Sequence, residues 1–220
     1  MIIQNNPYFE VPPGFVIFIS GVPGSGKTTI SYELLKKFDV FRIVEETDLI
    51  REALRGYNEY IKDEFKDRIQ FLFDEIEISD HTKLLTMDEA RQQCKFMKNS
   101  LENIVLRQQR KGIPSIVNGV HVIPEILDGI FENRNIIYVN LYVNSEKKIY
   151  DRLFNRNPNS YMLNHTPLIF QTNVDLYFST LKKSNESNYV FNNIDVTDLS
   201  IEETMLEVVN CIAKRTLHEL

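Results

Sequence analysis

Eight consecutive residues near the amino terminus have the types and the spacing needed to hold a chain of phosphate groups. The run from Gly21 to Thr28 reads Gly-Val-Pro-Gly-Ser-Gly-Lys-Thr and fits the pattern G-x-x-x-x-G-K-[ST]. In this pattern, glycines let backbone N–H groups close around phosphate oxygens, and the following helix turns its positive end toward them. The lysine reaches the β- and γ-phosphates, and the hydroxyl of the last residue binds Mg²⁺. We therefore expect a nucleotide to bind here, with Thr28 as a Mg²⁺ ligand, through the residues Gly21, Val22, Pro23, Gly24, Ser25, Gly26, Lys27, Thr28 and Thr29.

The residues on either side of this loop supply the elements that it needs. Residues 15–20 form a continuous apolar run typical of a buried strand, and residues 28–37 have helical spacing. Further apolar runs predict strands at 41–46, 114–119, 135–143 and 188–194, with helical patterns between them. The clearest helix runs from a capping box at Thr86 to Gly112, and the last covers about 200–216. This alternation predicts an α/β fold, a parallel sheet with helices on both faces.

The length and composition predict a single α/β domain. The chain has 220 residues, of which 43% are hydrophobic, and no run approaches 18 apolar residues. We expect a loose leader over residues 1–13, a single domain over 14–220, no membrane span and no secretion signal. Cys94 and Cys211 are isolated in helical patterns, so they predict reduced thiols and a cytoplasmic protein. The net charge of −6 argues against a nucleic acid as partner.

Residues 57–85 are longer than a minimal connection and mix charged with aromatic side chains. We expect a helical insertion after the second strand. It is either a cap on the substrate side or an extra helix over the edge of the sheet.

The residues that face the γ-phosphate distinguish the reactions that such a loop serves. The Asn-Lys-x-Asp of a GTPase does not occur, and the third strand ends in Asn118 where an ABC-type or AAA-type motor needs an acidic residue. A small-molecule kinase instead needs a carboxylate for the acceptor hydroxyl and arginines for the charge on the moving phosphoryl group.

The second strand supplies the candidate carboxylate, because it leads into Asp48-x-x-Arg51 at the start of a helix. In a parallel sheet its carboxyl end lies on the same edge as the phosphate loop. Asp48 is then placed to orient or deprotonate the acceptor, and Arg51 to bind an anionic group on it. Alternatively, Asp48 or Thr47 only caps the helix and Arg51 is solvated.

The fourth strand leads into a helix that carries Arg152 and Arg156, spaced i, i+4. We expect both guanidiniums on one side, at the base of a mobile lid over residues 152–166 that brackets ATP when it closes. The alternative is a surface helix whose arginines are balanced by Glu146 and Asp151.

Taken in order, the phosphate loop, Asp48-x-x-Arg51 and Arg152-x-x-x-Arg156 resemble the adenylate-kinase-like branch of P-loop kinases. The chain is most similar to 2-phosphoglycerate kinases, through the segment from Arg110 to Pro124 that contains Gly-Val-His, and through residues 189–195. The resemblance implies a P-loop three-layer sandwich with a five-stranded sheet in the order 2-3-1-4-5. It also implies Mg-ATP as the donor and the hydroxyl of a small, anionic metabolite as the acceptor, with a loop beside the adenine after the last strand. Lys27, Asp48, Arg152 and Arg156 are then the expected catalytic residues.

Two positions remain open within this resemblance. The family has Glu directly before Gly-Val-His, whereas this chain has Asn118, so either the metal relies on other ligands or activity is reduced. His121 either lies beside the acceptor or is a partly buried residue at the start of a helix over 122–131.

Three hypotheses follow. The first is an ATP-dependent kinase of a small anionic acceptor, with Asp48, Arg51 and His121 on the acceptor side. The second is a kinase of polynucleotide 5′-hydroxyl groups, which the acidic charge balance disfavours. The third is a non-catalytic ATP-binding sensor, suggested by Asn118.

Overall fold

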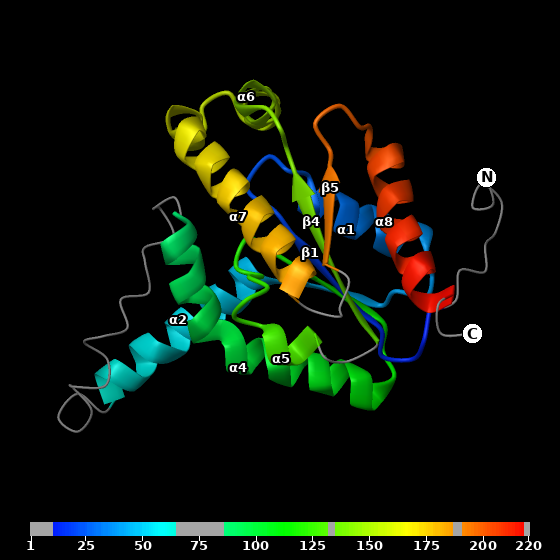
Figure 1. Ribbon diagram of the computed structural model, residues 1–220. Coiled ribbons are helices and arrows are strands. Elements are labelled where there is room, and N and C mark those ends of the chain that lie inside the picture. The colour runs from blue at the N-terminus through cyan, green and yellow to red at the C-terminus, as the bar shows by residue number, and fades with distance from the viewer. Residues whose placement is uncertain (1–10, 65–85, 132–134, 187–190, 218–220) are drawn as a thin grey trace.

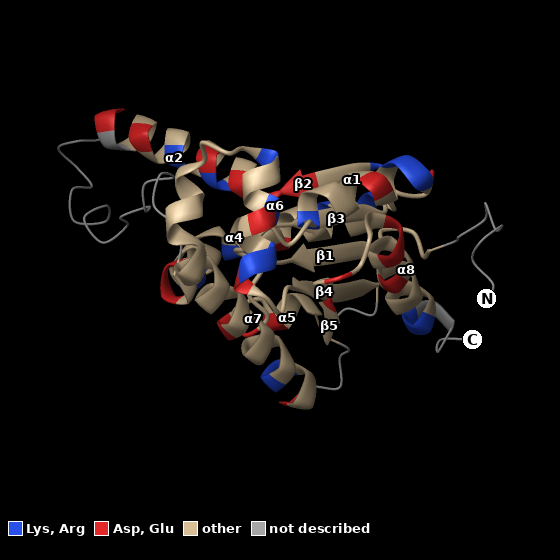
Figure 2. Ribbon diagram, turned by 90° about the horizontal axis from the view of Figure 1, so that it is seen from above, with Lys and Arg blue, Asp and Glu red and all other residues tan. Residues whose placement is uncertain are grey.

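A computed structural model describes residues 11–64, 86–131, 135–186 and 191–217 (Figure 1). Five parallel strands form one sheet in the order β2-β3-β1-β4-β5, as seen from above in Figure 2. This confirms the predicted fold class and strand order. The strands are β1 (Val16–Ser20), β2 (Ile43–Glu46), β3 (Ser115–Asn118), β4 (Ile136–Tyr142) and β5 (Phe191–Asp195).

The helices connect these strands in the pattern expected from the sequence. They are α1 (Lys27–Lys37), α2 (Thr47–Glu64), α4 (Met87–Lys111), α5 (Asp128–Phe131), α6 (Glu146–Arg156), α7 (Thr166–Glu186) and α8 (Ile201–Leu217), with a 3₁₀ helix η1 (Tyr161–His165). The predicted capping box of α4 is present, since Thr86 and Glu89 bond to each other's backbone N–H, and Gly112 ends the helix in the left-handed conformation.

Both faces of the sheet are covered, because the central strands are apolar on both sides. Every residue of β1 is buried. One core cluster joins the sheet to α1, α6 and α8, through side chains such as Ile30, Ile149 and Val208. A second cluster joins the opposite face to α4 and α5, through side chains such as Met97 and Phe131. The result is the predicted three-layer arrangement (Figure 1).

Parallel pairing brings the functional segments to one edge of the sheet. Ile19 of β1 pairs with Asn118 of β3, and Asn118 pairs with Glu46 of β2. The phosphate loop, the start of α2 and the Gly119–His121 turn all follow these strands, so they meet at the carboxyl edge.

The structure changes two expectations about helices. The helix expected over 122–131 is limited to α5, because residues 122–127 form turns around Pro124. Of the insertion expected at 57–85, residues 57–64 are the last turns of α2, which runs unbroken from the end of β2 and projects beyond the sheet (Figure 1). The rest of that insertion, and residues 1–10 of the expected leader, lie outside the described residues. No helix within the described ranges combines the length and the apolarity that a membrane crossing demands.

Candidate active site

The phosphate loop wraps around the start of α1 with the backbone that its glycines permit. Gly24 and Gly26 have φ of 87° and 93°, a left-handed region that side chains with a Cβ rarely adopt. Gly26 caps α1, and its carbonyl accepts the first helical bond, from the N–H of Ile30. The Ser25 side chain is buried, and its Oγ has no hydrogen-bond partner within the described part of the chain. The loop therefore presents open donors at the positive end of a helix, the arrangement that binds phosphate.

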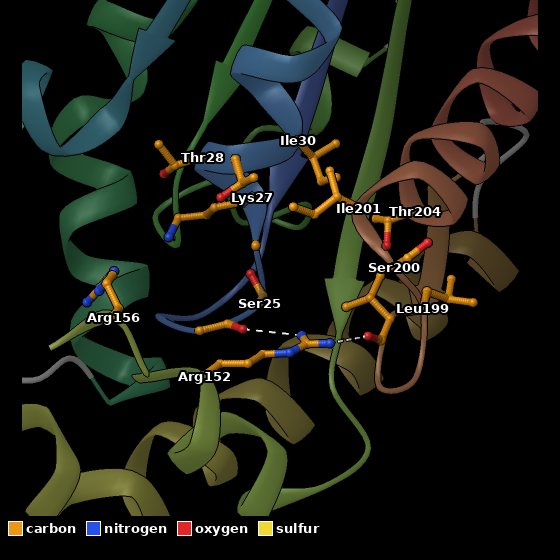
Figure 3. Close-up of a pocket in the computed structure, with 14 residues that line it drawn as sticks. Ser25, Lys27, Thr28, Ile30, Arg152, Arg156, Leu199, Ser200, Ile201 and Thr204 are labelled. Atoms are coloured by element: carbon orange, nitrogen blue, oxygen red, sulfur yellow. Dashed lines mark hydrogen bonds between the residues drawn. The ribbon is translucent and has the colours of Figure 1, made fainter. Parts of the chain in front are cut away.

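A cavity of about 470 Å³ lies beside this loop. One wall is the loop and the first turn of α1, and the opposite wall is the segment between β5 and α8 together with the first turn of α8 (Figure 3). The side chains of the opposite wall are mainly apolar, and they are Val196, Leu199, Ser200, Ile201 and Thr204. Such a cavity, polar at the loop and apolar at the far wall, suits a nucleotide with its base on the apolar side.

Arg152 joins the two walls. Its guanidinium donates to the carbonyl oxygen of Gly24 at 3.3 Å and to that of Val196 on the other wall (Figure 3). It also donates to the carbonyl oxygen of Thr197. Burial lowers the pKa of Arg152, while Asp198 and Asp195 act in the opposite direction. The side chain therefore fixes the phosphate loop relative to the β5–α8 segment.

Arg156 has a different environment one turn later. Both arginines line the cavity, as their spacing predicts, but Arg156 is exposed and its Nη2 lies 3.7 Å from Met162 Sδ. It points to the same side of the loop as Lys27 (Figure 3). Its guanidinium is thus exposed beside the cavity, whereas that of Arg152 is bonded to backbone carbonyl groups. Closure of the 152–166 segment stays a prediction.

Lys27 lies between the two halves of the site. Burial lowers the pKa of its ammonium group, the Asp48 carboxylate raises it, Arg156 lowers it and Glu46 raises it. The sheet has therefore brought together the predicted lysine, the predicted carboxylate and one predicted arginine, from three separate segments. Glu46 itself accepts a hydrogen bond from Tyr32 Oη at 2.9 Å.

At the start of α2, Asp48 is exposed and Arg51 is not. The Asp48 side chain is 53% exposed, whereas the Arg51 side chain is only 11% exposed. Arg51 Nη1 lies 3.6 Å from Asp48 Oδ1 and donates to Gln93 Oε1 at 3.3 Å. Its Nε and Nη2 both donate to Glu52 Oε1, at 3.2 and 3.0 Å. The solvated Arg51 of the alternative hypothesis is therefore wrong, and Glu52 occupies the Nε and Nη2 donors of this guanidinium.

His121 is fully buried, so it has no surface with which to bind an acceptor directly. This corrects the expectation that it lies beside the acceptor, and the reason is that the turn after β3 folds its ring under α2. Its Nδ1 lies 3.0 Å from Thr47 Oγ1 and 3.7 Å from Asp48 Oδ1, and its Nε2 lies 3.4 Å from Arg51 Nη1. Burial is the main cause that lowers its pKa to about 4, so the ring is neutral at pH 7.

Gly119 makes this close approach possible. A Cβ at this position would lie 1.7 Å from Thr47 Oγ1, and φ is 157°. Its neighbour Asn118 is 2% exposed, and Asn118 Nδ2 has no hydrogen-bond partner among the described residues.

The residues present fit Mg-ATP. Thr28 is exposed and is the second residue of α1, beside the loop, and Asp48 and Glu46 are near enough to influence Lys27. Among the described residues, no group of three or more His, Cys, Asp or Glu could hold a metal. Mg²⁺ is commonly bound through one or two protein ligands together with substrate phosphates and water, a role for which the Thr28 hydroxyl is suited.

Sequence reasoning missed two parts of the site. Gln93 follows Ala90 by three residues and precedes Met97 by four, so it is a polar residue on the core-facing side of α4. That position was the available signal. Glu52 gave no signal, because adjacent residues on a helix usually point in different directions.

Comparisons with known proteins identify the family of the chain. The profile of the AAA domain family matches residues 20–160. The 2-phosphoglycerate kinase of Methanocaldococcus jannaschii is 27% identical over 215 residues, which cover 91% of this chain and 63% of that protein. The mevalonate-3-phosphate 5-kinase of Thermoplasma acidophilum is 27% identical over 129 residues, which cover 56% of this chain and 60% of that protein.

The match spans slightly less than two thirds of the length of three of these 2-phosphoglycerate kinases, at 63–65%. Among solved structures, a gluconokinase from Sinorhizobium meliloti 1021 superposes with a TM-score of 0.54 at 16% identity, covering 93% of this chain and 94% of that one. The sequence matches confirm the predicted resemblance to 2-phosphoglycerate kinases. Because the family profile matches residues 20–160, which include the phosphate loop, the chain belongs to the AAA domain family.

Proposed function

We propose that this chain is an ATP-dependent kinase that transfers the γ-phosphoryl group of Mg-ATP to a hydroxyl of a small anionic metabolite of the 2-phosphoglycerate type. The observation that carries the proposal is the position of Lys27. The Asp48 carboxylate raises the pKa of its ammonium group and Arg156 lowers it, and Lys27 and Arg156 line the same cavity, so a carboxylate and an arginine both lie near the end of the phosphate loop. Converging groups of this kind are what phosphoryl transfer requires.

The donor side of the proposal follows from the cavity. The loop amides and Lys27 bind the β- and γ-phosphates, and the adenine lies against the apolar wall that includes Leu199 and Ile201. Thr28 holds Mg²⁺, which neutralises phosphate charge when it is bound. Arg152 keeps the loop and the opposite wall in register through its bonds to Gly24 and Val196.

The acceptor side of the proposal is the edge formed by α2. The exposed Asp48 carboxylate accepts the proton of the attacking hydroxyl or orients that hydroxyl. Arg51 binds the anionic group of the acceptor. Arg156 stabilises the charge that develops on the transferred phosphoryl group.

The test is release of ADP from Mg-ATP with a panel of phosphorylated metabolites that includes 2-phosphoglycerate and mevalonate 3-phosphate. Lys27→Ala should lose most ATP affinity and all transfer. Asp48→Asn should lose transfer and keep ATP binding, measured by isothermal titration calorimetry. An Asp48→Asn variant as active as the wild type would refute the assignment of the carboxylate.

Asn118 favours a second candidate, a nucleotide-binding sensor without catalysis. Its buried amide stands at the end of β3, where a carboxylate would serve metal chemistry. Binding of Mg-ATP with no turnover of any acceptor on the panel would support the sensor, and acceptor-dependent release of ADP would exclude it. The free thiols of Cys94 and Cys211 support a cytoplasmic location for either candidate.

A further inference from the structure

The guanidinium of Arg51 has two edges with different surroundings. The inner edge is Nη1, which meets the buried side chains of Gln93 at 3.3 Å and His121 at 3.4 Å and also lies 3.6 Å from the exposed carboxylate of Asp48. The outer edge is Nε and Nη2, which both donate to the exposed carboxylate of Glu52. Glu52 also accepts a hydrogen bond from Arg55 Nη1 at 3.2 Å. One edge is therefore anchored by buried side chains, and the other is held by an exposed carboxylate.

The proton positions at the inner edge follow from chemistry. An arginine is always a donor, so His121 Nε2 must accept from Nη1. The ring proton of the neutral histidine is then on Nδ1, from which it is donated to Thr47 Oγ1 at 3.0 Å. Thr47 is the first residue of α2 and directly precedes Asp48. One buried ring thus touches both the arginine and the helix start that carries the carboxylate.

We propose that His121 is a positioning residue, which together with Gln93 fixes the inner edge of Arg51 so that the outer edge is presented to the anionic group of the acceptor. The carboxylate or phosphate of the acceptor takes the place of Glu52 on Nε and Nη2, where two parallel N–H groups match two oxygens. His121 itself touches no substrate. This inference rests on the proposed function for the identity of the acceptor, but the tautomer of His121 and the order of Arg51 do not depend on it.

Two substitutions should shift acceptor binding in opposite directions, which general damage to the fold would not do. His121→Leu removes the anchor and should raise KM for 2-phosphoglycerate about ten- to a hundredfold, the range for a hydrogen bond to a charged group, with KM for ATP unchanged. His121→Gln keeps an acceptor near the position of Nε2 and should recover most of the loss. Glu52→Gln weakens the competing carboxylate and should lower KM by up to about fivefold, the range for an exposed ion pair.

The matched control is Thr180→Val, which removes a buried hydroxyl 3.5 Å from Tyr138 Oη, on α7. It should change stability without changing KM for the acceptor. A shift in KM for the acceptor equal to that of His121→Leu would show that any buried polar loss has the same effect, and would overturn the proposal.

Nuclear magnetic resonance tests the anchor without any acceptor. In the wild type, the imidazole signal that His121→Gln removes should show a proton on Nδ1, and the Arg51 Nε–H signal should be sharp and dispersed. That Arg51 signal should broaden or shift in His121→Leu and persist in His121→Gln. A proton on Nε2, or an Arg51 signal unchanged in His121→Leu, overturns the proposal. Failure of the wild type to phosphorylate 2-phosphoglycerate refutes the proposed function instead, and the resonance measurements then decide the anchor alone.

Discussion

Replacing Gly119 with alanine should destabilise the protein through a single steric conflict. The new Cβ would lie 1.7 Å from Thr47 Oγ1 and 2.8 Å from Thr47 Cβ, which is far inside van der Waals contact. Overpacking in a buried site costs about 1–3 kcal/mol. A backbone conformation disfavoured for residues with a Cβ, here φ of 157°, costs a further amount of about 1–3 kcal/mol. We therefore expect a loss of at least about 2 kcal/mol.

The assay is urea unfolding of Gly119→Ala, Thr47→Ala and the double variant, analysed as a double-mutant cycle. Removing Thr47 Oγ1 relieves the closest clash, so the double variant should be more stable than the sum of the single effects predicts. The control is Gly56→Ala on α2, where a Cβ meets nothing within 4 Å. It should stabilise the protein by about 0.5–1 kcal/mol, because alanine favours helix over glycine. Wild-type stability of Gly119→Ala, or strict additivity with Thr47→Ala, would refute the packing argument.

Three further predictions follow from the site and the core. Folding lowers the pKa of His121 to about 4, so the unfolded chain binds the proton more tightly than the folded chain. The free energy of unfolding should therefore fall as pH decreases from about 6.5 toward 4. His121→Gln should reduce this fall, measured by urea unfolding at several pH values. Arg152→Ala should lower the free energy of unfolding by about 1.5–3 kcal/mol, because three carbonyl acceptors lose a charged donor. Arg156→Ala should instead leave the urea midpoint unchanged and reduce kcat. Burial raises the pKa of the Cys94 thiol to about 12 and that of the Cys211 thiol to about 11. A disulfide reagent at pH 8 should therefore label both thiols more slowly in the native protein than in an unfolded control. Rapid labelling of native Cys94 would contradict its burial in the core.

Most helices and strands could be predicted from the sequence, because their hydrophobic patterns and capping residues match the burial that the structure shows. The apolar run of β1, the capping box at Thr86 and the glycine at position 112 each indicate a boundary through nearby residues alone. The prediction of a helix over the whole of 122–131 was wrong, because burial in that segment does not depend on helical structure. Val122 and Ile123 are buried in the core, but they reach it from irregular backbone before a turn, and a hydrophobic pattern does not distinguish such a segment from a helix.

Only part of the candidate site could be predicted from the sequence. The sequence correctly paired Arg152 and Arg156 as lining one cavity, since an i, i+4 spacing on a helix is a local property. The different environments of the two guanidiniums were not predictable, because they depend on carbonyl groups of Gly24 and of residues 196–197, far away along the chain. The burial of His121 has the same origin, since Thr47 and Arg51 reach it across 74 and 70 residues.

By itself, the sequence determined the phosphate loop, the alternation of strands and helices, and the residue types available for phosphoryl transfer. Each of these is set by chemistry within a few neighbouring residues, such as glycine conformations, helix periodicity and the reach of a lysine. Only the tertiary structure decided which of those residues touch. Parallel pairing of β1, β3 and β2 brings Lys27, His121 and Asp48 to one edge, and burial then separates the exposed carboxylate from the enclosed arginine and histidine. Whether a charged side chain can reach a ligand depends on the groups packed around it, and those groups come from distant parts of the chain.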